Sequence, residues 1–330
     1  MVLFQRFSLH QVILMRDNNL TKIVNNYLKY LKYKKKNTYK KRSCEICGSK
    51  KNTVIREKIS WNKGIYGIFP VVACNFCGFL FQLIKFNKKF YNDFYSEYYR
   101  KIIYSDKIPS KEFLRDQKFR GKKLYNFVKK FFKKKGSILD VGSSVGLMLQ
   151  PFKKKGWQIN GNDPDTPFVE YAVSKLKLPI DLCQAEDMKY DKKFDLIIIM
   201  GSLEHCYDPN IVLEKCSKYS KKNSILVLEG RGDPIGKIKD FFNHNHHRYF
   251  NGNSLELMMI KHGWTPFLTT QYPIYGPSRL PGFSVYGRFS AKKPTINSLK
   301  KIIKNGKKET IDSVKYRFKY FEYINKKKKF

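Results

Sequence analysis

Residues 137–149 read SILDVGSSVGLML and decide the fold. The short apolar segment Ser137–Val141 predicts a buried strand, and it runs directly into the turn Gly142–Gly146. Leu147–Lys155 then has the pattern of a helix. Glycines in such a turn let the backbone approach a ligand and let the helix begin close to the strand. A generic strand–helix turn has a similar composition, so the turn needs support from the sequence around it.

Strands and helices alternate along the rest of this region. Phe194–Met200 is its most apolar segment and fits a central parallel strand. A helix is expected over Asn253–His262, with a capping box formed by Asn253 and Glu256. The other expected strands are Trp157–Gly161, Ile180–Cys183, Ser224–Glu229, Thr265–Thr270 and Phe283–Phe289, and the other expected helices are Pro167–Lys177 and Asn210–Tyr219. The pattern predicts a Rossmann-like, doubly wound α/β sheet that ends in an antiparallel strand pair.

Two cysteine pairs upstream repeat one design, Cys44-Glu-Ile-Cys47-Gly and Cys74-Asn-Phe-Cys77-Gly. Two Cys separated by two residues direct both sulfurs at one centre, and the following Gly permits a tight turn. Four thiolates in a tetrahedron suit Zn²⁺ and leave no open coordination position, so a small structural zinc module is expected. Iron in a rubredoxin-like site and unligated buried thiols are the alternatives.

The remaining three of the seven Cys are scattered, and the N-terminal MVLFQRFSLHQVILM has no small-residue cleavage site. An odd Cys count without a secretory signal favours a reducing compartment, so we expect a cytoplasmic protein. No apolar run is long enough for a transmembrane segment.

Composition divides the chain into five expected parts. These are a basic helical segment 1–43, the zinc-binding module 44–85, a helical connector 86–135, the α/β core 136–293 and a basic helical tail 294–330. The helices expected in both tails have apolar residues at helical spacing. Packing of these helices against the body is favoured, and a helix that binds a membrane surface or a partner is the alternative.

The charge is strongly positive, with 66 Lys and Arg against 27 Asp and Glu. Lys outnumbers Arg, and Asn, Ile, Phe and Tyr are also abundant, as AT-rich codons produce. A solvated surface shaped by codon usage is favoured. Attraction to nucleic acid, to an anionic membrane or to phosphorylated substrates is the alternative. Recognition of nucleic acid would gain from clustered Arg, whereas here Lys dominates and is spread along the chain.

Acidic and polar residues follow the ends of several expected strands. Asp163 ends the second strand, where a carboxylate can accept both hydroxyls of a ribose. Glu186 follows the third strand, and Glu204 with His205 follows the central one. Ligands of such sheets bind at the carboxyl ends of the strands, so these residues predict a binding site at this edge.

The residues from about 137 to 292 resemble the class I S-adenosylmethionine-dependent methyltransferases. ILDVGSSVG is similar to the first motif of that family, NGNDPD to the acidic end of its second strand, and FDLIIIMGSLEH to its fourth-strand region. The whole chain is similar to a narrower group that carries a four-Cys zinc module and includes sugar C-methyltransferases. FYSEYY at 94–99 and HHRYF at 246–250 share in this likeness.

The resemblance implies which residues hold S-adenosylmethionine. Asp140, Gly142 and Gly146 would shape the pocket for its methionine end, with Ser144 where the family has its middle glycine. Asp163 would hold the ribose, and Ala185 and Glu186 would lie at the adenine edge. A dinucleotide is the alternative ligand, but the turn lacks the Gly-x-Gly-x-x-Gly pattern.

A base is needed if the acceptor atom is oxygen or carbon. The candidates are His205, which follows the central strand, and His244 and His247, which precede RYF; a hydrogen bond that fixes a loop is the alternative role. Tyr98 and Tyr99 are candidates to cover the cofactor or to join the core. The expected function is methyl transfer to a small polar acceptor such as a nucleotide-linked sugar. A nucleic-acid methyltransferase or binder and an inactive binding module are the rivals.

Overall fold

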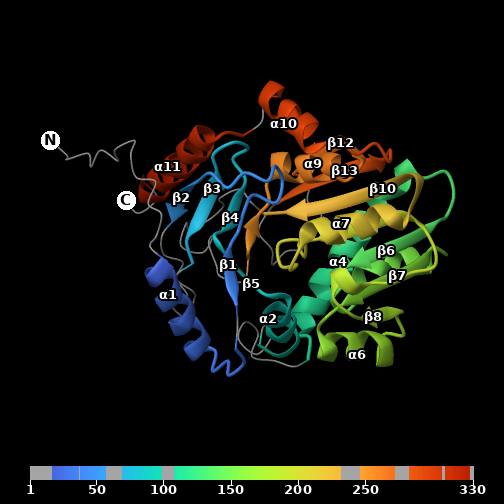
Figure 1. Cartoon of the computed structure of the whole chain (residues 1–330). Coiled ribbons are helices and arrows are strands. Elements are labelled where there is room, and N and C mark those ends of the chain that lie inside the picture. Colours follow the sequence, from blue (N-terminus) through green and yellow to red (C-terminus); the bar gives the residue numbers. More distant parts are fainter. Residues whose placement is uncertain are drawn as a thin grey trace.

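The computed structural model describes residues 17–36, 38–56, 69–98, 108–231, 246–271, 282–306 and 309–327. Figure 1 shows a large sheet flanked by helices on one side of the molecule and smaller sheets on the other. The large sheet has seven strands in the order β12-β13-β10-β9-β6-β7-β8. They are β6 (Ser137–Val141), β7 (Gln158–Asp163), β8 (Ile180–Leu182), β9 (Phe194–Met200), β10 (Ser220–Gly230), β12 (Trp264–Thr270) and β13 (Phe283–Phe289).

The strand directions confirm the Rossmann-like sheet with a C-terminal antiparallel pair. Strands β6 to β10 pair in parallel, whereas β13 runs antiparallel between β10 and β12. Counted from β6, the order is 3-2-1-4-5-7-6, which differs from the 3-2-1-4-5-6 order of dinucleotide-binding folds. Strands β7 and β8 lie on one side of β6, whereas β9 and β10 lie on the other, so the order in which strands are added reverses between β6 and β9. Ligands of open α/β sheets bind at such a point.

Apolar side chains cover both faces of this sheet. Along β9, Ile197 and Ile199 join one core cluster, while Leu196 and Ile198 join the other, because successive strand residues point to opposite faces. Helices α7 (Pro209–Lys218) and α9 (Gly252–Lys261) contribute to the first cluster. Helices α4 (Lys111–Val128), α5 (Gln150–Lys154) and α6 (Thr166–Ser174) contribute to the second. Helices on both faces make the sheet doubly wound.

The start of α9 differs from the sequence prediction. The capping box is formed by Asn251 and Ser254, not by Asn253 and Glu256. Asn251 Oδ1 accepts from Ser254 N at 2.9 Å, and Ser254 Oγ accepts from Asn251 N at 2.8 Å. Glu256 instead accepts from Thr269 Oγ1 at 2.5 Å. The capping box lies two residues earlier than expected, because Asn251 and Ser254 form the same reciprocal pair as the expected residues.

The smaller sheets combine distant segments. Strands β2 (Asn52–Arg56), β3 (Val71–Cys74), β4 (Leu80–Gln82) and β11 (Arg248–Tyr249) form a four-stranded sheet, and β1 (Tyr39–Lys41) pairs with β5 (Ile84–Phe86). Strand β11 joins this sheet at β4, with Arg248 opposite Phe81 and Tyr249 opposite Leu80. The segment that follows the expected histidines therefore completes the sheet of the cysteine region. Helix α2 (Lys88–Asp93) and a π-helical turn, η1 (Phe94–Tyr98), follow β5.

Both tails pack against the body through apolar side chains. Leu20 and Val24 of α1 (Asp17–Tyr30) are buried in the same cluster as Val314 and Phe318 of α11 (Ile311–Lys327). Helices α1 and α11 lie on the cysteine side of the molecule (Figure 1). Helix α10 (Ile296–Asn305) buries Leu299 and Ile303 in the first sheet cluster. This packing confirms the favoured interpretation of both tails. None of the helices in the described ranges combines the length and apolarity that crossing a bilayer requires.

Candidate functional site

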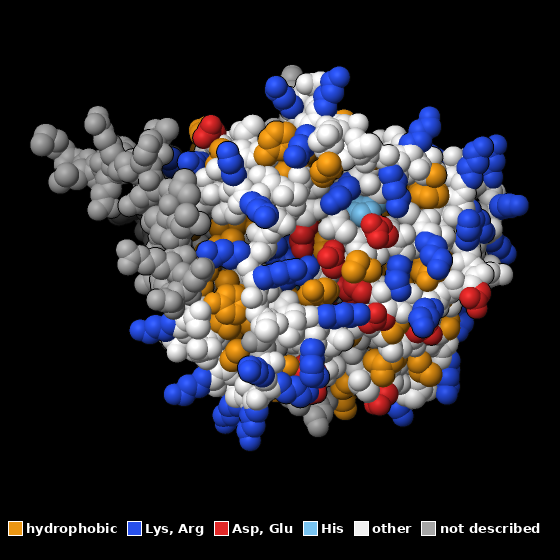
Figure 2. Space-filling view, in the orientation of Figure 1, with side chains coloured by type: hydrophobic (Ala, Val, Ile, Leu, Met, Phe, Trp, Pro, Cys, Tyr) orange, Lys and Arg blue, Asp and Glu red, His pale blue; other side chains and the backbone are white. Residues whose placement is uncertain are grey.

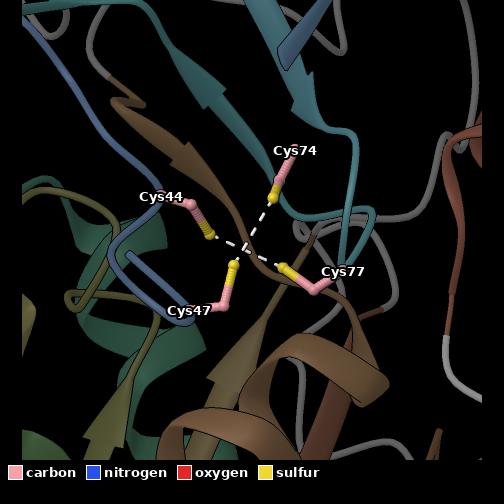
Figure 3. Close-up of side chains that lie close together, drawn as sticks. All are labelled: Cys44, Cys47, Cys74 and Cys77. Carbon is pink, nitrogen blue, oxygen red and sulfur yellow. Dashed lines mark hydrogen bonds between the residues drawn. The ribbon is translucent and has the colours of Figure 1, made fainter. Parts of the chain in front are cut away.

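The four cysteines of the two pairs converge on one point (Figure 3). Cys44 and Cys47 lie in the turn after β1, and Cys74 and Cys77 lie in the turn between β3 and β4. The Sγ atoms of Cys44 and Cys77 are 3.5 Å apart, those of Cys47 and Cys74 are 3.6 Å apart, and all four lie within 4.8 Å of one another. A Zn–S bond of about 2.3 Å places tetrahedral sulfurs ~3.8 Å apart, so this set fits zinc.

Each cysteine pair ends in a glycine with a left-handed backbone. Gly48 has φ 75° and Gly78 has φ 71°, and each donates its N–H to the carbonyl of the first Cys of its pair. These short turns place both sulfurs of a pair on the same side of the loop. The predicted metal residues are thus brought together by local turns and by the pairing of β1, which precedes the first cysteine pair, with β5, which follows the second.

The glycine turn after β6 is built against the end of β7. The N–H groups of Gly142 and Ser143 both donate to Asn162 O at 2.9 Å. Gly142 has φ 74°, and a Cβ there would lie 2.5 Å from Ser202 Cβ, so no larger residue fits. Ser144 also has a positive φ of 55°, which explains why glycine suits this position. Its Oγ is buried and has no hydrogen-bond partner among the described residues.

Asp163 closes this turn from the end of β7. Its carboxylate accepts from Ser144 N at 2.7 Å and from Asp165 N at 3.0 Å. Asp140 lies at the neighbouring end of β6, where burial raises its pKa to about 7 although the charge of Arg120 opposes the shift. The structure therefore brings the predicted methionine-end residues and the predicted ribose residue to the carboxyl ends of two adjacent strands.

The residues predicted to lie at the adenine edge are connected to the loop after β9. Ala185 and Glu186 form part of the short helix η4 (Ala185–Asp187), and both are buried. Glu186 Oε1 accepts from Asp208 N at 2.9 Å, which ties η4 to the loop after β9. In that loop, burial raises the pKa of Glu204 to about 7.

Two of the three predicted histidines meet at a tyrosine. The Tyr95 hydroxyl lies 3.2 Å from His205 Nδ1 and 3.1 Å from His247 Nε2. His205 follows β9 and His247 precedes β11, so the pair joins the large sheet to the cysteine side. The ring of His246 also lies close to that of His205, with centroids 4.8 Å apart. His244 lies outside the described residues.

Sequence reasoning missed Tyr95. It belongs to the FYSEYY segment, of which only the last two tyrosines were considered. Tyr98 packs near Tyr33 with ring centroids 6.0 Å apart, and Tyr99 lies outside the described residues. The segment was a usable signal, but only the fold shows which of its hydroxyls reaches the histidines.

The loop that carries His205 is anchored beside the glycine turn. Ser202 Oγ donates to Val141 O at 2.7 Å, at the end of β6. A hydroxyl between two imidazoles can donate to one ring and accept from the other, so it can pass a proton between them. The arrangement therefore places the carboxylates of Asp140 and Asp163 at the ends of β6 and β7, and it places groups able to accept and pass a proton beside the loop after β9.

Comparisons with known proteins agree with this geometry. Residues 114–268 match a family model described as a methyltransferase domain. Ubiquinone biosynthesis O-methyltransferases are similar: that of Rhodopseudomonas palustris (strain HaA2) is 32% identical over 96 residues, covering 28% of this chain and 38% of the relative. The enzyme of Pelagibacter ubique (strain HTCC1062) is 32% identical over 96 residues, covering 28% of this chain and 40% of the relative. The matched segment is thus about two fifths of these relatives' length.

The solved structures to which the chain is similar include two methyltransferases. Magnesium protoporphyrin IX methyltransferase from Synechocystis PCC 6803 has a TM-score of 0.47 and 14% identity, covering 62% of this chain and 100% of that one. A glycopeptide N-methyltransferase has a TM-score of 0.43 and 12% identity, covering 53% of this chain and 94% of that one. The family match covers residues 114–268, a segment that includes β6 to β10 of the large sheet.

Proposed function

We propose that this chain transfers a methyl group from S-adenosylmethionine to a small polar acceptor, and that the acceptor is a nucleotide-linked sugar or a related precursor. The observation that carries this proposal is the Tyr95 hydroxyl held between His205 and His247 in a chain with a methyltransferase domain.

The cofactor supplies an electrophilic methyl group on a sulfonium when it is bound. Asp140 and the turn 142–146 would hold its methionine end, and Asp163 would accept hydrogen bonds from its ribose. Ala185 and Glu186 would border its adenine. Ser144 Oγ, buried without a partner among the described residues, is a hydrogen-bonding group that this ligand can satisfy. The residues present therefore fit S-adenosylmethionine.

His205, Tyr95 and His247 would serve the acceptor. One imidazole takes the proton of the acceptor group, and the Tyr95 hydroxyl relays it to the second imidazole. The acceptor's electron pair forms the new bond to the methyl carbon, while the sulfur keeps the electrons of the bond that breaks. Positioning of the acceptor in line with that bond supplies much of the rate, and the base contributes a further ~10²–10⁴-fold.

The surface supports a small acceptor over nucleic acid. Figure 2 shows Lys and Arg scattered across the visible face, with acidic side chains gathered near its centre. A protein that follows a nucleic-acid backbone presents a continuous basic groove instead. The likeness to the four-Cys sugar methyltransferase group supports a sugar acceptor. The ubiquinone relatives are named for O-methyl transfer, which likewise needs removal of a proton.

A transfer assay with labelled S-adenosylmethionine tests this proposal. Nucleotide-linked sugars are offered in parallel with RNA and DNA, at ~50 and ~200 mM salt. We expect label in a sugar nucleotide, with a mild salt response because the acceptor carries only a diphosphate. Label in RNA or DNA that collapses by ~10³-fold or more at the higher salt would replace this function with the nucleic-acid alternative.

A further inference from the structure

The histidines of the proposed site are held from the cysteine side of the molecule. Gln82 in β4 donates from its backbone N to His247 O at 2.9 Å and from its side chain to His246 O at 2.7 Å. The ring of Tyr91 meets that of His247 edge-on, with centroids 4.6 Å apart. The backbone of this segment is therefore fixed by β4, the strand that follows the second cysteine pair.

Arg248 extends this support to the loop of His205. Its guanidinium is fully buried and donates from Nη1 to Cys206 O at 2.6 Å and to Glu204 O at 3.3 Å. Nη2 also donates to Tyr207 O at 3.1 Å. One side chain thus binds the carbonyls on both sides of His205, while its own backbone directly follows His247.

Glu45 sets the orientation of this guanidinium. Its carboxylate accepts from Arg248 through both oxygens, Oε1 from Nη2 at 2.6 Å and Oε2 from Nε. Such a two-point contact between planar groups fixes direction as well as distance. Glu45 lies between Cys44 and Cys47, so the turn that places two sulfurs at the metal centre also places this carboxylate.

Three cationic side chains surround the carboxylate in this buried position, those of Arg248, Arg42 and Lys85. Arg42 Nη1 donates to Oε1 at 2.8 Å, and Lys85 Nζ lies 3.7 Å from the same atom. A buried guanidinium that lost this partner would leave its position or draw in water, because an uncompensated buried charge is costly.

We propose that Glu45 is a positioning residue for the methyl transfer site: from the first cysteine turn it orients Arg248, and through Arg248 the backbone around His205 and His247. The inference rests on the proposed function for its kinetic consequence only. Its structural consequence, the placement of two imidazoles around Tyr95, holds with or without turnover.

Glu45→Gln tests this, because it keeps the shape of the side chain and removes its charge. The zinc-loaded full chain with Glu45→Gln is compared with the zinc-loaded full chain with Arg248→Lys. The second variant keeps the positive charge but loses the planar group that donates at two points. Lys221→Gln is the control, because it removes an exposed ion pair with Asp195 near the amino end of β9, away from the histidines. Turnover, the KM for S-adenosylmethionine and the imidazole ¹⁵N signals of ligand-free protein are measured.

We expect kcat to fall by ~10- to 100-fold in Glu45→Gln and Arg248→Lys, as small displacements of reacting groups produce, with the KM for S-adenosylmethionine changed by less than about twofold. The signals of His205 and His247 should shift in both variants and stay unchanged in Lys221→Gln. If the wild-type chain shows no turnover but the shifts appear, the proposed function fails and the positioning role stands.

Two results would overturn the inference. One is a Glu45→Gln protein with wild-type kcat and unmoved imidazole signals. The other is a parallel loss of kcat, cofactor binding and zinc content, which would make Glu45 a residue of general stability. If Glu45→Gln does not fold, the same measurements on Glu45→Asp and Arg248→Lys decide between these outcomes, since both variants keep the charge.

Discussion

The two halves of the proposed site are built in different ways. The cofactor half comes from consecutive segments of one parallel sheet: the turn after β6, the end of β7 and the start of η4. Its groups are held by backbone hydrogen bonds, such as those from Gly142 and Ser143 to Asn162. The acid–base half brings together Tyr95, His205 and His247, which come from three separate segments.

This difference shows where each half is vulnerable. The apolar core of the sheet fixes the cofactor half, so single polar substitutions there should act locally. The acid–base half depends on the junction between the cysteine region and the large sheet, where β11 pairs with β4 and Arg248 binds Glu45. A change far from the histidines in sequence should therefore affect proton transfer more than cofactor binding.

Removal of the metal centre should have the largest effect. Cys44→Ser combined with Cys77→Ser leaves two thiolates, which cannot close a tetrahedral site, so the expected content of about one zinc per chain should be lost. We expect a loss of more than ~4 kcal/mol in the free energy of unfolding, because metal binding and folding are linked in small modules. Elemental analysis and thermal unfolding measure both effects.

Cys183→Ser is the matched control, since this thiol is half-buried and lies outside the cysteine turns. It should keep full zinc content and nearly full stability. A double variant that retained its metal and its stability would exclude the zinc centre and leave the four thiols as ordinary buried side chains.

Removal of the Tyr95 hydroxyl should have the second-largest effect. Tyr95→Phe keeps the ring contacts and removes the bond to both imidazoles, so kcat should fall by ~10²-fold or more. Cofactor affinity should stay within about twofold of wild type, because Tyr95 belongs to the acid–base half. Steady-state kinetics and calorimetry measure the two quantities. Tyr98→Phe is the control and should leave kcat unchanged. Equal loss of turnover and of cofactor binding in Tyr95→Phe would contradict the separation of the halves.

Protonation of Asp140 should produce a smaller effect, confined to the cofactor half. Burial raises its pKa to about 7, so below that pH the carboxyl group is neutral and attracts the cationic methionine end less. Affinity for S-adenosylmethionine should therefore rise by up to ~10-fold per pH unit below pH 7 and level off above pH 8. Calorimetry from pH 5.5 to 8.5 checks this, and Asp140→Asn should flatten the profile. A slope that persists in Asp140→Asn would assign it to Glu204 instead.

The raised pKa of Asp140 also makes the free energy of unfolding depend on pH. Because the folded pKa of Asp140 lies above its usual value, the folded chain binds more protons than the unfolded chain between about pH 4 and pH 7. This contribution to the free energy of unfolding is complete below pH 4 and is lost as the pH rises through 7. In denaturant titrations, the free energy of unfolding of wild type should therefore fall relative to that of Asp140→Asn, which is neutral at every pH, as the pH rises from 4 to 8.

The convergence of the residues in the proposed cofactor half could be predicted from the sequence because these residues follow local rules. Apolar strands, glycine turns and acidic strand ends occur within short segments, and parallel pairing brings their ends together. The cysteine pairs are equally local. The helix start at Asn251 was predicted wrongly, since Asn253 with Glu256 and Asn251 with Ser254 satisfy similar capping patterns two residues apart.

The acid–base half could be predicted only in part. His205 and His247 were candidates by position, but the role of Tyr95 depends on where η1 packs, and no local pattern encodes that packing. The contact of Glu45 with Arg248 joins residues 203 positions apart in the chain. The cysteine spacing identifies the ligands of a metal, but it does not indicate that a residue between them would reach the loop after β9.

Binding of S-adenosylmethionine to the zinc-loaded full chain and to Asp163→Asn tests the proposed cofactor site most directly. Asparagine keeps one of the two oxygens that accept from the backbone N–H groups of Ser144 and Asp165, and it removes the charge offered to the ribose. Charge-assisted hydrogen bonds contribute ~1.5–3 kcal/mol each, so calorimetry should show one site per chain in the wild type and at least ~10-fold weaker binding in the variant. Asp191→Asn, at an exposed loop position, should bind as the wild type does. Equal binding by wild type and Asp163→Asn, or no binding by either, would contradict the assignment of this pocket.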